Sequence, residues 1–366
     1  MGEILTLTEE HIAGVANLYM RSMRGQKRPA GERLRQYFSE IFLGNPWVCA
    51  DIPSLVYFDK GSVAGFMGVV PRPMVFQGRA IRVAATTQFM VDRDHRGPAA
   101  IALLSRLFKG PQDLSYGDGA SEDAHRIYTG VGGHPAQLYS FNWLRPLRPL
   151  LTAREYLDRG SAGSRLAGRL VAAAAVPVEY LLNKFPQELF RMPESPFESR
   201  KVDSDGLLRC IQEIGWKEPL QPVYEPAAFR WLMSQTAVSG TLGELQMTTV
   251  HEPDGAPAGW HVYWAKRGGP AQVLQIGVRR PNQFDNVLLA LFRDAWKLGA
   301  SSVKGQSMPR FLVNLTNQNC LFRLPNTAVV FHSRDAELVN TLYRGQAALS
   351  RLDGECWMHF SDQTWE

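Results

Sequence analysis

Apolar and polar residues alternate along the first 143 residues in a pattern that predicts a mixed α/β fold. Ile12, Val15 and Tyr19 recur at helical spacing, whereas the stretch from residue 54 onward has the period of strands. Glycine-containing turns at 59–61 and 77–79 are hairpin signals. The expected elements are strand 3–7, helices 8–23 and 31–43, strands 54–58, 62–70, 74–76 and 81–91, helix 99–108, strand 113–116, helix 121–131 and a closing strand 137–143.

The part of the chain after residue 205 repeats this order in outline. Its succession of hairpin, strand, helix, strand and helix indicates a duplicated fold. We therefore expect an α/β protein of two domains, 1–147 and 205–366, joined by a connector over 148–204. Each domain would have a mostly antiparallel central sheet flanked by helices. The elements expected in the second domain are helix 225–234, strands 243–250, 259–265 and 271–278, helix 285–298, strand 302–305 and helix 309–320.

Length and composition agree with two globular domains. Of the 366 residues, 45% are hydrophobic and 20% charged, so we expect a core of ordinary size without metals or disulfides. The four cysteines form no CxxC pair, which favours a reduced, cytoplasmic setting. A formal charge of +5 suits an anionic partner. Nucleic acid is not expected to be that partner, because no run of Lys and Arg is interleaved with aromatic residues.

The connector is basic and apolar. Between residues 145 and 191, eight basic side chains accompany four acidic ones, and 170–176 is an unbroken apolar run. No stretch of about 20 apolar residues occurs, so we expect no membrane span. Two interpretations are open for 165–184. It is either an interfacial helix that makes peripheral contact with anionic lipid on the inner membrane face, or a linker helix packed between the domains.

The segment 84–104 carries the strongest chemical signal. A β-rich run ends in a turn of small residues that opens a helix. The start of a helix presents unpaired N–H groups and the positive end of the helix dipole, which suits a pyrophosphate. Arg96 would add charge there, and Gly97 would allow close approach of the backbone. The alternative for Arg96 is a solvated loop charge.

This segment resembles the acyl-CoA motif of the GNAT superfamily of acyltransferases. That motif is a strand, then Arg/Gln-x-x-Gly-x-Gly/Ala, then a helix with paired leucines, and it is similar to Arg96-Gly97 and Leu103-Leu104. The resemblance implies acyl-CoA as the cosubstrate, and no cluster with metal-ligand spacing occurs in the sequence. The residues that it places on the cofactor are Phe89, Met90, Val91, Arg96, Gly97, Ala99 and Ala100.

A second match lies at 121–132. Ala124, Tyr128 and Gly132 fall on the family's Asn-x-x-Ala-x-x-x-Tyr-x-x-x-Gly helix. The resemblance implies that Tyr128 lies near the CoA sulfur and protonates the leaving thiolate. A phenol suits this role because it is neutral at pH 7 and can donate a proton. The alternative is an ordinary core tyrosine on an amphipathic helix.

Acyl transfer to an amine also needs a base and a polarised carbonyl group. Backbone N–H groups at a β-bulge in the central strand would polarise the carbonyl, and the candidate bases are Asp118, Glu122 and Asp123. Glu122 and Asp123 also suit the first turn of a helix, where acids are favoured electrostatically. The corresponding loop of the second domain, 279–285, has no glycine, so we expect that domain to shape the acceptor cleft.

These observations predict an acyl-CoA-dependent N-acyltransferase, with acetyl as the first expectation for the acyl group. The acceptor would be a small amine or an amino sugar. One alternative is a long-chain N-acyltransferase that acts on a lipid amine, as GNAT-type ceramide synthases would, and the connector motivates it. The other is a non-catalytic GNAT-like protein, suggested by Ala99 and Ile101 where the family motif has glycines.

Overall fold

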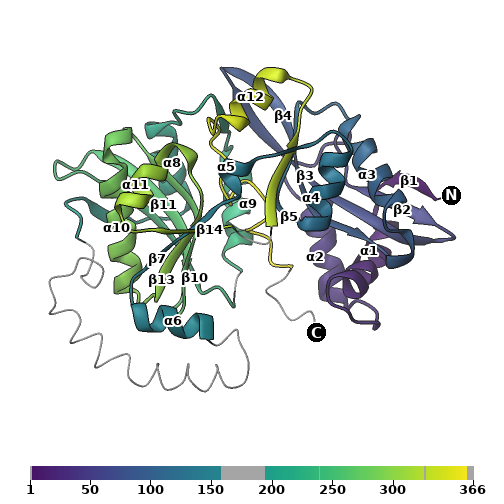
Figure 1. Ribbon diagram of the computed structural model, residues 1–366, viewed down its shortest axis with the longest axis horizontal. Helices are drawn as coiled ribbons and strands as arrows, with labels where there is room; N and C mark the ends of the chain where they lie inside the picture. The colour runs from purple at the N-terminus through teal and green to yellow at the C-terminus, as the bar shows by residue number, and fades with distance from the viewer. Residues whose placement is uncertain (1, 158–193, 239, 325–326, 361–366) are drawn as a thin grey trace.

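The computed structural model describes residues 2–157, 194–238, 240–324 and 327–360, and its two sheets form two lobes that lie side by side (Figure 1). The expected mixed α/β class is confirmed, with two mixed sheets that are flanked by helices. Residues 165–184, for which a membrane contact is expected, lie outside the described residues. Within the described ranges, no helix has the length and apolar character that a membrane crossing requires.

The first sheet is covered on both faces by helices of the N-terminal half. α1 (Glu9–Ser22) and α2 (Glu32–Phe42) share one core cluster, and α3 (Pro98–Phe108) and α4 (Glu122–Gly130) share another. Neighbouring strand residues such as Phe66 and Met67 point to opposite clusters, as the two-residue period of a strand requires. The strand order is β1 (Glu3–Thr6), β2 (Leu55–Asp59), β3 (Ser62–Phe76), β4 (Arg79–Val91), β5 (Leu114–Ser121), β15 (Thr327–His332) and β6 (His134–Pro135), with β9 (Leu220–Pro222) also paired to β3.

The second sheet repeats this arrangement. α8 (Ser204–Ile214) and α9 (Pro226–Thr236) cover the face toward the first lobe, and α10 (Phe284–Lys297) and α11 (Leu312–Asn317) cover the other. In both sheets the neighbours are antiparallel except for one central parallel pair, β4 with β5 and β12 with β13. The strand order is β14 (Leu321–Arg323), β7 (Asn142–Pro146), β13 (Ser302–Gln306), β12 (Ala271–Val278), β11 (Pro257–Ala265), β10 (Glu244–His251) and β8 (Glu198–Lys201).

The two sheets exchange one strand each. The expectation that 137–143 closes the first sheet is wrong, because Gln137–Ser140 forms helix α5 and β7 pairs with β13 and β14 of the second sheet. Its place beside β5 is taken by β15, from the far end of the chain (Figure 1). The boundaries at residues 147 and 205 remain predictions, and the exchanged strands tie the lobes together across them.

β3 is longer than its sequence suggests. The expected strands 62–70 and 74–76 form one strand that runs through Pro71 and Pro73. β2 pairs with β3 only as far as Met67. On the same edge of β3, the Val223 N–H donates to the Pro73 carbonyl and β9 pairs from Met74 onward. Pro71 therefore lies at an unpaired part of this edge. A strand tolerates proline where the missing N–H would face an unpaired edge, which explains the continuity.

The segment after α12 (Ala336–Tyr343) returns between the lobes (Figure 1). Leu352, Trp357 and Phe360 are buried in the cluster that α1, α2, α8 and α9 share. The Phe360 ring lies 4.7 Å from that of Phe38, centroid to centroid. The C-terminal segment therefore forms part of the core between the lobes. The remaining elements are helix α6 (Pro149–Leu157) and 3-10 helices Arg93–His95, Pro281–Gln283 and Pro309–Phe311.

Candidate active site

A β-bulge interrupts the middle of β4. Thr87 pairs with Gly68 and Met90 with Phe66, so two residues of β4 stand opposite one residue of β3. Gln88, inside this bulge, has a positive φ of 48°. A bulge takes its backbone groups out of the ladder and bends the strand. The bulge expected from the chemistry of acyl transfer is therefore present, at Gln88 and the following Phe89.

β4 and β5 separate beside this bulge. Their parallel pairing ends at Ala85 and Tyr116, and from Gly117 on β5 is paired with β15 alone. The opening leads to a cavity of about 410 Å³ between the end of β4, the start of α3 and the first turns of α4. We call it the donor cavity. Six of the seven residues expected on the cofactor line it, namely Phe89, Met90, Val91, Arg96, Gly97 and Ala100.

The start of α3 has the features of an anion site. Gly97 has a φ of 89°, which a residue with a Cβ rarely adopts, and Pro98 occupies the first turn, where no N–H is needed. The Arg96 side chain is exposed, and no described side chain forms an ion pair with it. The turn therefore offers backbone N–H groups and an available cation at one end of the donor cavity.

Two of the expected site residues are buried beside the donor cavity. Ala99 packs in the core with Leu103 and Leu104. Tyr128 is 2% exposed, lies edge-on to Phe108, and has its hydroxyl beside the Thr86 side chain. Burial raises the pKa of Tyr128, so the phenol stays protonated. Thr86 lies next to the bulge, so the Tyr128 hydroxyl is close to the point where β4 and β5 separate, although Tyr128 does not line the donor cavity.

The three candidate bases have different surroundings. Glu122 and Asp123 are exposed in the first turn of α4, where Asp123 pairs with Arg126. Asp118 follows the last residues of β5 that pair with β4, and its Oδ1 accepts the Glu355 N–H at 2.9 Å. Burial raises the pKa of Asp118. Of the three, Asp118 lies beside the bulge region.

Glu355 is the site residue that the sequence did not indicate. The Thr87 hydroxyl donates to its Oε2 at 2.5 Å, and the backbone N–H of Gln88 also lies at the carboxyl. Burial, followed by the neighbouring charge of Asp118, raises the pKa of Glu355 to about 7. A Cβ on Gly119 would overlap Oε1 of Glu355, so a larger residue at that position of β5 would displace the carboxyl group.

A second cavity of about 410 Å³ opens on the other side of the bulge. It lies between α1, the bulge, β12 and the C-terminal segment. Met23 lines both cavities, and the adjacent Gln88 and Phe89 line one each. We call this second cavity the acceptor cavity. It adjoins the donor cavity at the bulge, where the Glu355 carboxyl group contacts Thr87 and Gln88. The other residues of the acceptor cavity are Tyr19, Arg24, Leu242, Trp264, Gln272, Val273, Leu274, Arg351, Cys356, Met358 and Phe360.

A buried polar network fixes the segment that carries Glu355. The Asp353 carboxylate is fully buried, 3.3 Å from Nη2 of Arg72, and accepts from the Tyr224 and Ser350 hydroxyls at 2.5 Å each. The Arg72 guanidinium lies 4.2 Å from the Trp47 ring centroid. These contacts join β3, the approach to α9 and the C-terminal turn. They hold the backbone two residues before Glu355 in place.

No metal site is evident, since the described residues contain no cluster of three or more His, Cys, Asp or Glu side chains that could hold an ion. The arrangement is instead suited to proton transfer beside a reactive carbonyl group. It combines a carboxyl group of raised pKa, a buried phenol and backbone N–H groups released by a bulge.

Comparison with known proteins identifies the fold. No protein-family model and no curated protein matches the sequence. Among solved structures, a GCN5-related N-acetyltransferase from Anabaena variabilis is similar over 92% of this chain and 74% of its own, with 13% identity and a TM-score of 0.58. A protein of unknown function and probable N-acyltransferase from Enterococcus faecalis matches over 91% and 73%, with 12% identity and a TM-score of 0.57.

N-myristoyltransferase from Saccharomyces cerevisiae, bound to myristoyl-CoA and inhibitors, is similar over 90% of this chain and 79% of its own, with 10% identity and a TM-score of 0.50. The chain therefore has the fold of the GNAT acyltransferases, in a form that contains two GNAT-like domains. At these identities the likeness defines the fold, and the chemistry has to be argued from the site.

Proposed function

We propose that this protein is an acyl-CoA-dependent N-acyltransferase. The observation that carries the proposal is the meeting of two cavities of about 410 Å³ at the β4 bulge, with the Glu355 carboxyl group at the junction. The fold is that of proteins named as acetyltransferases and N-myristoyltransferase, the latter bound to myristoyl-CoA. A two-substrate transfer needs such a pair of adjoining cavities with proton-transfer groups between them.

The donor cavity suits acyl-CoA. Its pyrophosphate would bind at the start of α3, against the Gly97 turn and the Arg96 guanidinium. The pantetheine arm would lie in the opening between β4 and β5, which brings the thioester to the bulge. The backbone amides around Phe89 would then stabilise the negative charge that develops on the thioester oxygen.

Glu355 is the proposed base and Tyr128 the proposed acid. The acceptor nitrogen attacks the thioester carbon and forms the new C–N bond, while its proton passes to the Glu355 carboxylate. The C–S bond then breaks, and the departing thiolate takes the Tyr128 proton. A base with a pKa of about 7 is well matched to neutral pH, because half of it is ionised and its conjugate acid is still a good donor.

Glu122 and Asp123 are less suited than Glu355 to act as the base, because both are exposed to solvent on α4. Asp118 holds the Glu355 backbone and raises its pKa, which makes it a positioning residue in this proposal. The acceptor cavity contains Arg24 and Arg351 besides Glu355. A small amine is the proposed acceptor, because the Glu355 carboxylate would receive its proton, and acetyl is the first acyl group to test.

Isothermal titration calorimetry with acetyl-CoA and palmitoyl-CoA, followed by an assay of thiol release, tests the proposal. We expect binding of at least one thioester and release of free CoA only when an amine is present. Absence of binding to both would overturn the assignment of the donor cavity. Tight binding without transfer to any amine would support the non-catalytic alternative instead.

A further inference from the structure

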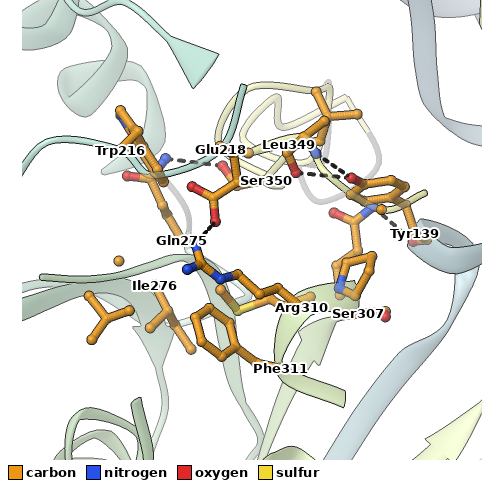
Figure 2. A pocket seen from close by; sticks show the side chains of 18 of the residues that line it. Tyr139, Trp216, Glu218, Gln275, Ile276, Ser307, Arg310, Phe311, Leu349 and Ser350 are labelled. Carbon is orange, nitrogen blue, oxygen red and sulfur yellow. Dashed lines mark hydrogen bonds and ion pairs between the residues drawn. The ribbon is translucent and has the colours of Figure 1, made fainter. Parts of the chain in front are cut away.

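The second sheet has an opening that corresponds to the donor opening of the first. β12 and β13 are parallel only at Ala271 with Val303 and Gln272 with Lys304, and then separate. The space between them is a narrow cavity of about 70 Å³, closed on one side by the segment that precedes Arg351 (Figure 2). At 10–15 Å³ for each water-sized group, it holds roughly five to seven such groups, close to the six heavy atoms of one aromatic ring, and we call it the ring-sized cavity.

Five aromatic side chains, Tyr139, Trp143, Trp216, Trp260 and Phe311, are among the residues that line this ring-sized cavity. Trp216 and Trp260 meet edge to face with centroids 5.1 Å apart, and Phe311 forms the floor in Figure 2. Trp260 is fully buried, and its Nε1 donates to Oε1 of Gln275 at 3.0 Å, so the wall is held in place. Rigid aromatic walls around a slot of this volume favour a flat apolar group.

Two polar atoms in the lining are without a partner among the described residues. They are the Oγ of Ser307, which is 1% exposed, and the Oε1 of Gln306. Gln306 is the last residue of β13 and Ser307 follows it, just beyond the point where β12 and β13 separate. Buried polar atoms are nearly always satisfied by protein, water or a ligand, so water or a polar ligand atom is expected beside these two.

Charged side chains also line this cavity. Arg310 and Glu218 pair at 3.3 Å at the mouth, as Figure 2 shows. Arg351 lines both this cavity and the acceptor cavity, and its Nη2 donates to Oδ1 of Asn142 at 2.7 Å. No described carboxylate lies within ion-pair distance of the Arg351 guanidinium, although the charge of Arg351 lowers the pKa of Asp118.

The two cavities also share Val273 and Leu274, so they are neighbours across β12 with Arg351 between them. We infer that the acceptor is an aromatic amino acid, free or as the C-terminal residue of a short peptide, whose ring fills the ring-sized cavity and whose carboxylate binds Arg351. Its amine is then directed toward Glu355. This inference rests on the proposed acyl transfer and names the substrate class of that site.

A panel of acceptors tests it with the full chain and acetyl-CoA or palmitoyl-CoA. The panel contains phenylalanine, glycyl-phenylalanine, phenethylamine, which lacks the carboxylate, and glycine, which lacks the ring. We expect kcat/KM for phenylalanine or glycyl-phenylalanine to exceed that for phenethylamine and for glycine at least tenfold. Which of phenylalanine and glycyl-phenylalanine has the higher kcat/KM shows whether the aromatic residue is bound free or as a C-terminal residue. Equal rates with phenethylamine or glycine would overturn the inference.

Two variants and a binding readout separate this inference from the proposed function. Ala348→Phe fills the ring-sized cavity from its partly exposed lining, and Arg351→Gln removes the cation. Each should raise the KM for phenylalanine at least tenfold while the affinity for acyl-CoA stays unchanged, and Val313→Phe, at a 71% exposed position outside this cavity, serves as the control. Unchanged acyl-CoA affinity also shows that the variants fold.

Calorimetry with N-acetylphenylalanine, which cannot be acylated again, gives the second readout. Binding that Ala348→Phe abolishes supports the cavity even if acyl-CoA fails to bind, which would count against the proposed function alone. If the protein turns over acyl-CoA but neither variant changes the KM for phenylalanine, the inference about the acceptor is refuted and the proposed function stands.

Discussion

The Thr87 hydroxyl donates to the Glu355 carboxyl group at 2.5 Å, although the two residues are 268 positions apart in the chain. Thr87 belongs to the strand with the bulge and Glu355 to the C-terminal segment that returns between the lobes. This contact brings a carboxyl group of raised pKa to the point where the donor and acceptor cavities meet. The expected catalytic machinery therefore combines residues from both ends of the chain.

Glu355→Gln should lower kcat by roughly 100- to 10,000-fold, the usual contribution of a general base. Acyl-CoA affinity should stay the same, because Glu355 lies on the acceptor side of the bulge. Glu213→Gln, an exposed glutamate on α8, is the matched control and should leave both quantities unchanged. A wild-type kcat in Glu355→Gln would remove this residue from the mechanism.

The pH profile should report the same group. Because Glu355 must be ionised to accept a proton, kcat/KM should fall as the pH drops below about 7. Asp118→Asn should move this acidic limb to lower pH, since the charge of Asp118 is one cause of the raised pKa. An acidic limb that does not move in Asp118→Asn would contradict the coupling.

Stability should depend on pH through Glu355 as well. Its pKa in the folded protein, about 7, lies above the ordinary 4.5, so its contribution to stability is fully present below 4.5 and is lost as the pH rises through 7. Glu355→Gln avoids this loss. The Tm of the variant relative to wild type should therefore be higher at pH 8 than at pH 4.5, which differential scanning fluorimetry can measure.

Arg96→Ala should weaken acyl-CoA binding by about 1–3 kcal/mol, the range for a hydrogen bond to a charged group. Arg106→Ala, in the last turn of the same helix and equally exposed, serves as the control. Titration calorimetry with CoA and acetyl-CoA distinguishes the two. Equal affinities in both variants would leave Arg96 as a solvated loop charge.

Tyr128→Phe should reduce turnover while leaving acyl-CoA affinity and stability nearly unchanged. The ring packs against Phe108, and phenylalanine preserves that contact. Only the departing thiolate would need the hydroxyl, so the loss should appear in kcat. If the variant turns over at the wild-type rate, Tyr128 serves packing alone.

Asp353→Ala should destabilise the protein by about 3–5 kcal/mol, because it leaves the Arg72 charge buried without its partner. Urea unfolding measures the change. Asp353→Asn, which retains oxygen and removes the charge, should cost less. A loss below 1 kcal/mol in Asp353→Ala would mean that the network does not hold the Glu355 segment.

Local patterns were sufficient for much of the N-terminal half. The hairpin signals, the helix periodicity and the Arg96-Gly97 turn predicted β2 to β4, α3 and six of the residues that line the donor cavity, because each depends on neighbours within a few residues. The duplication was also visible from the order of elements. These features are set by backbone preferences and by the two- and 3.6-residue periods, which act within a single element.

The strand exchange and the position of Glu355 depended on tertiary structure. The expected strand 137–143 overlaps β7 only at Asn142 and Trp143, and the place that it would have taken in the first sheet is filled by β15, which comes from the other end of the chain. Glu355 lies in a short turn with no motif of its own. Its pKa is raised because folding buries it beside Asp118, and no local pattern records a contact between such distant residues.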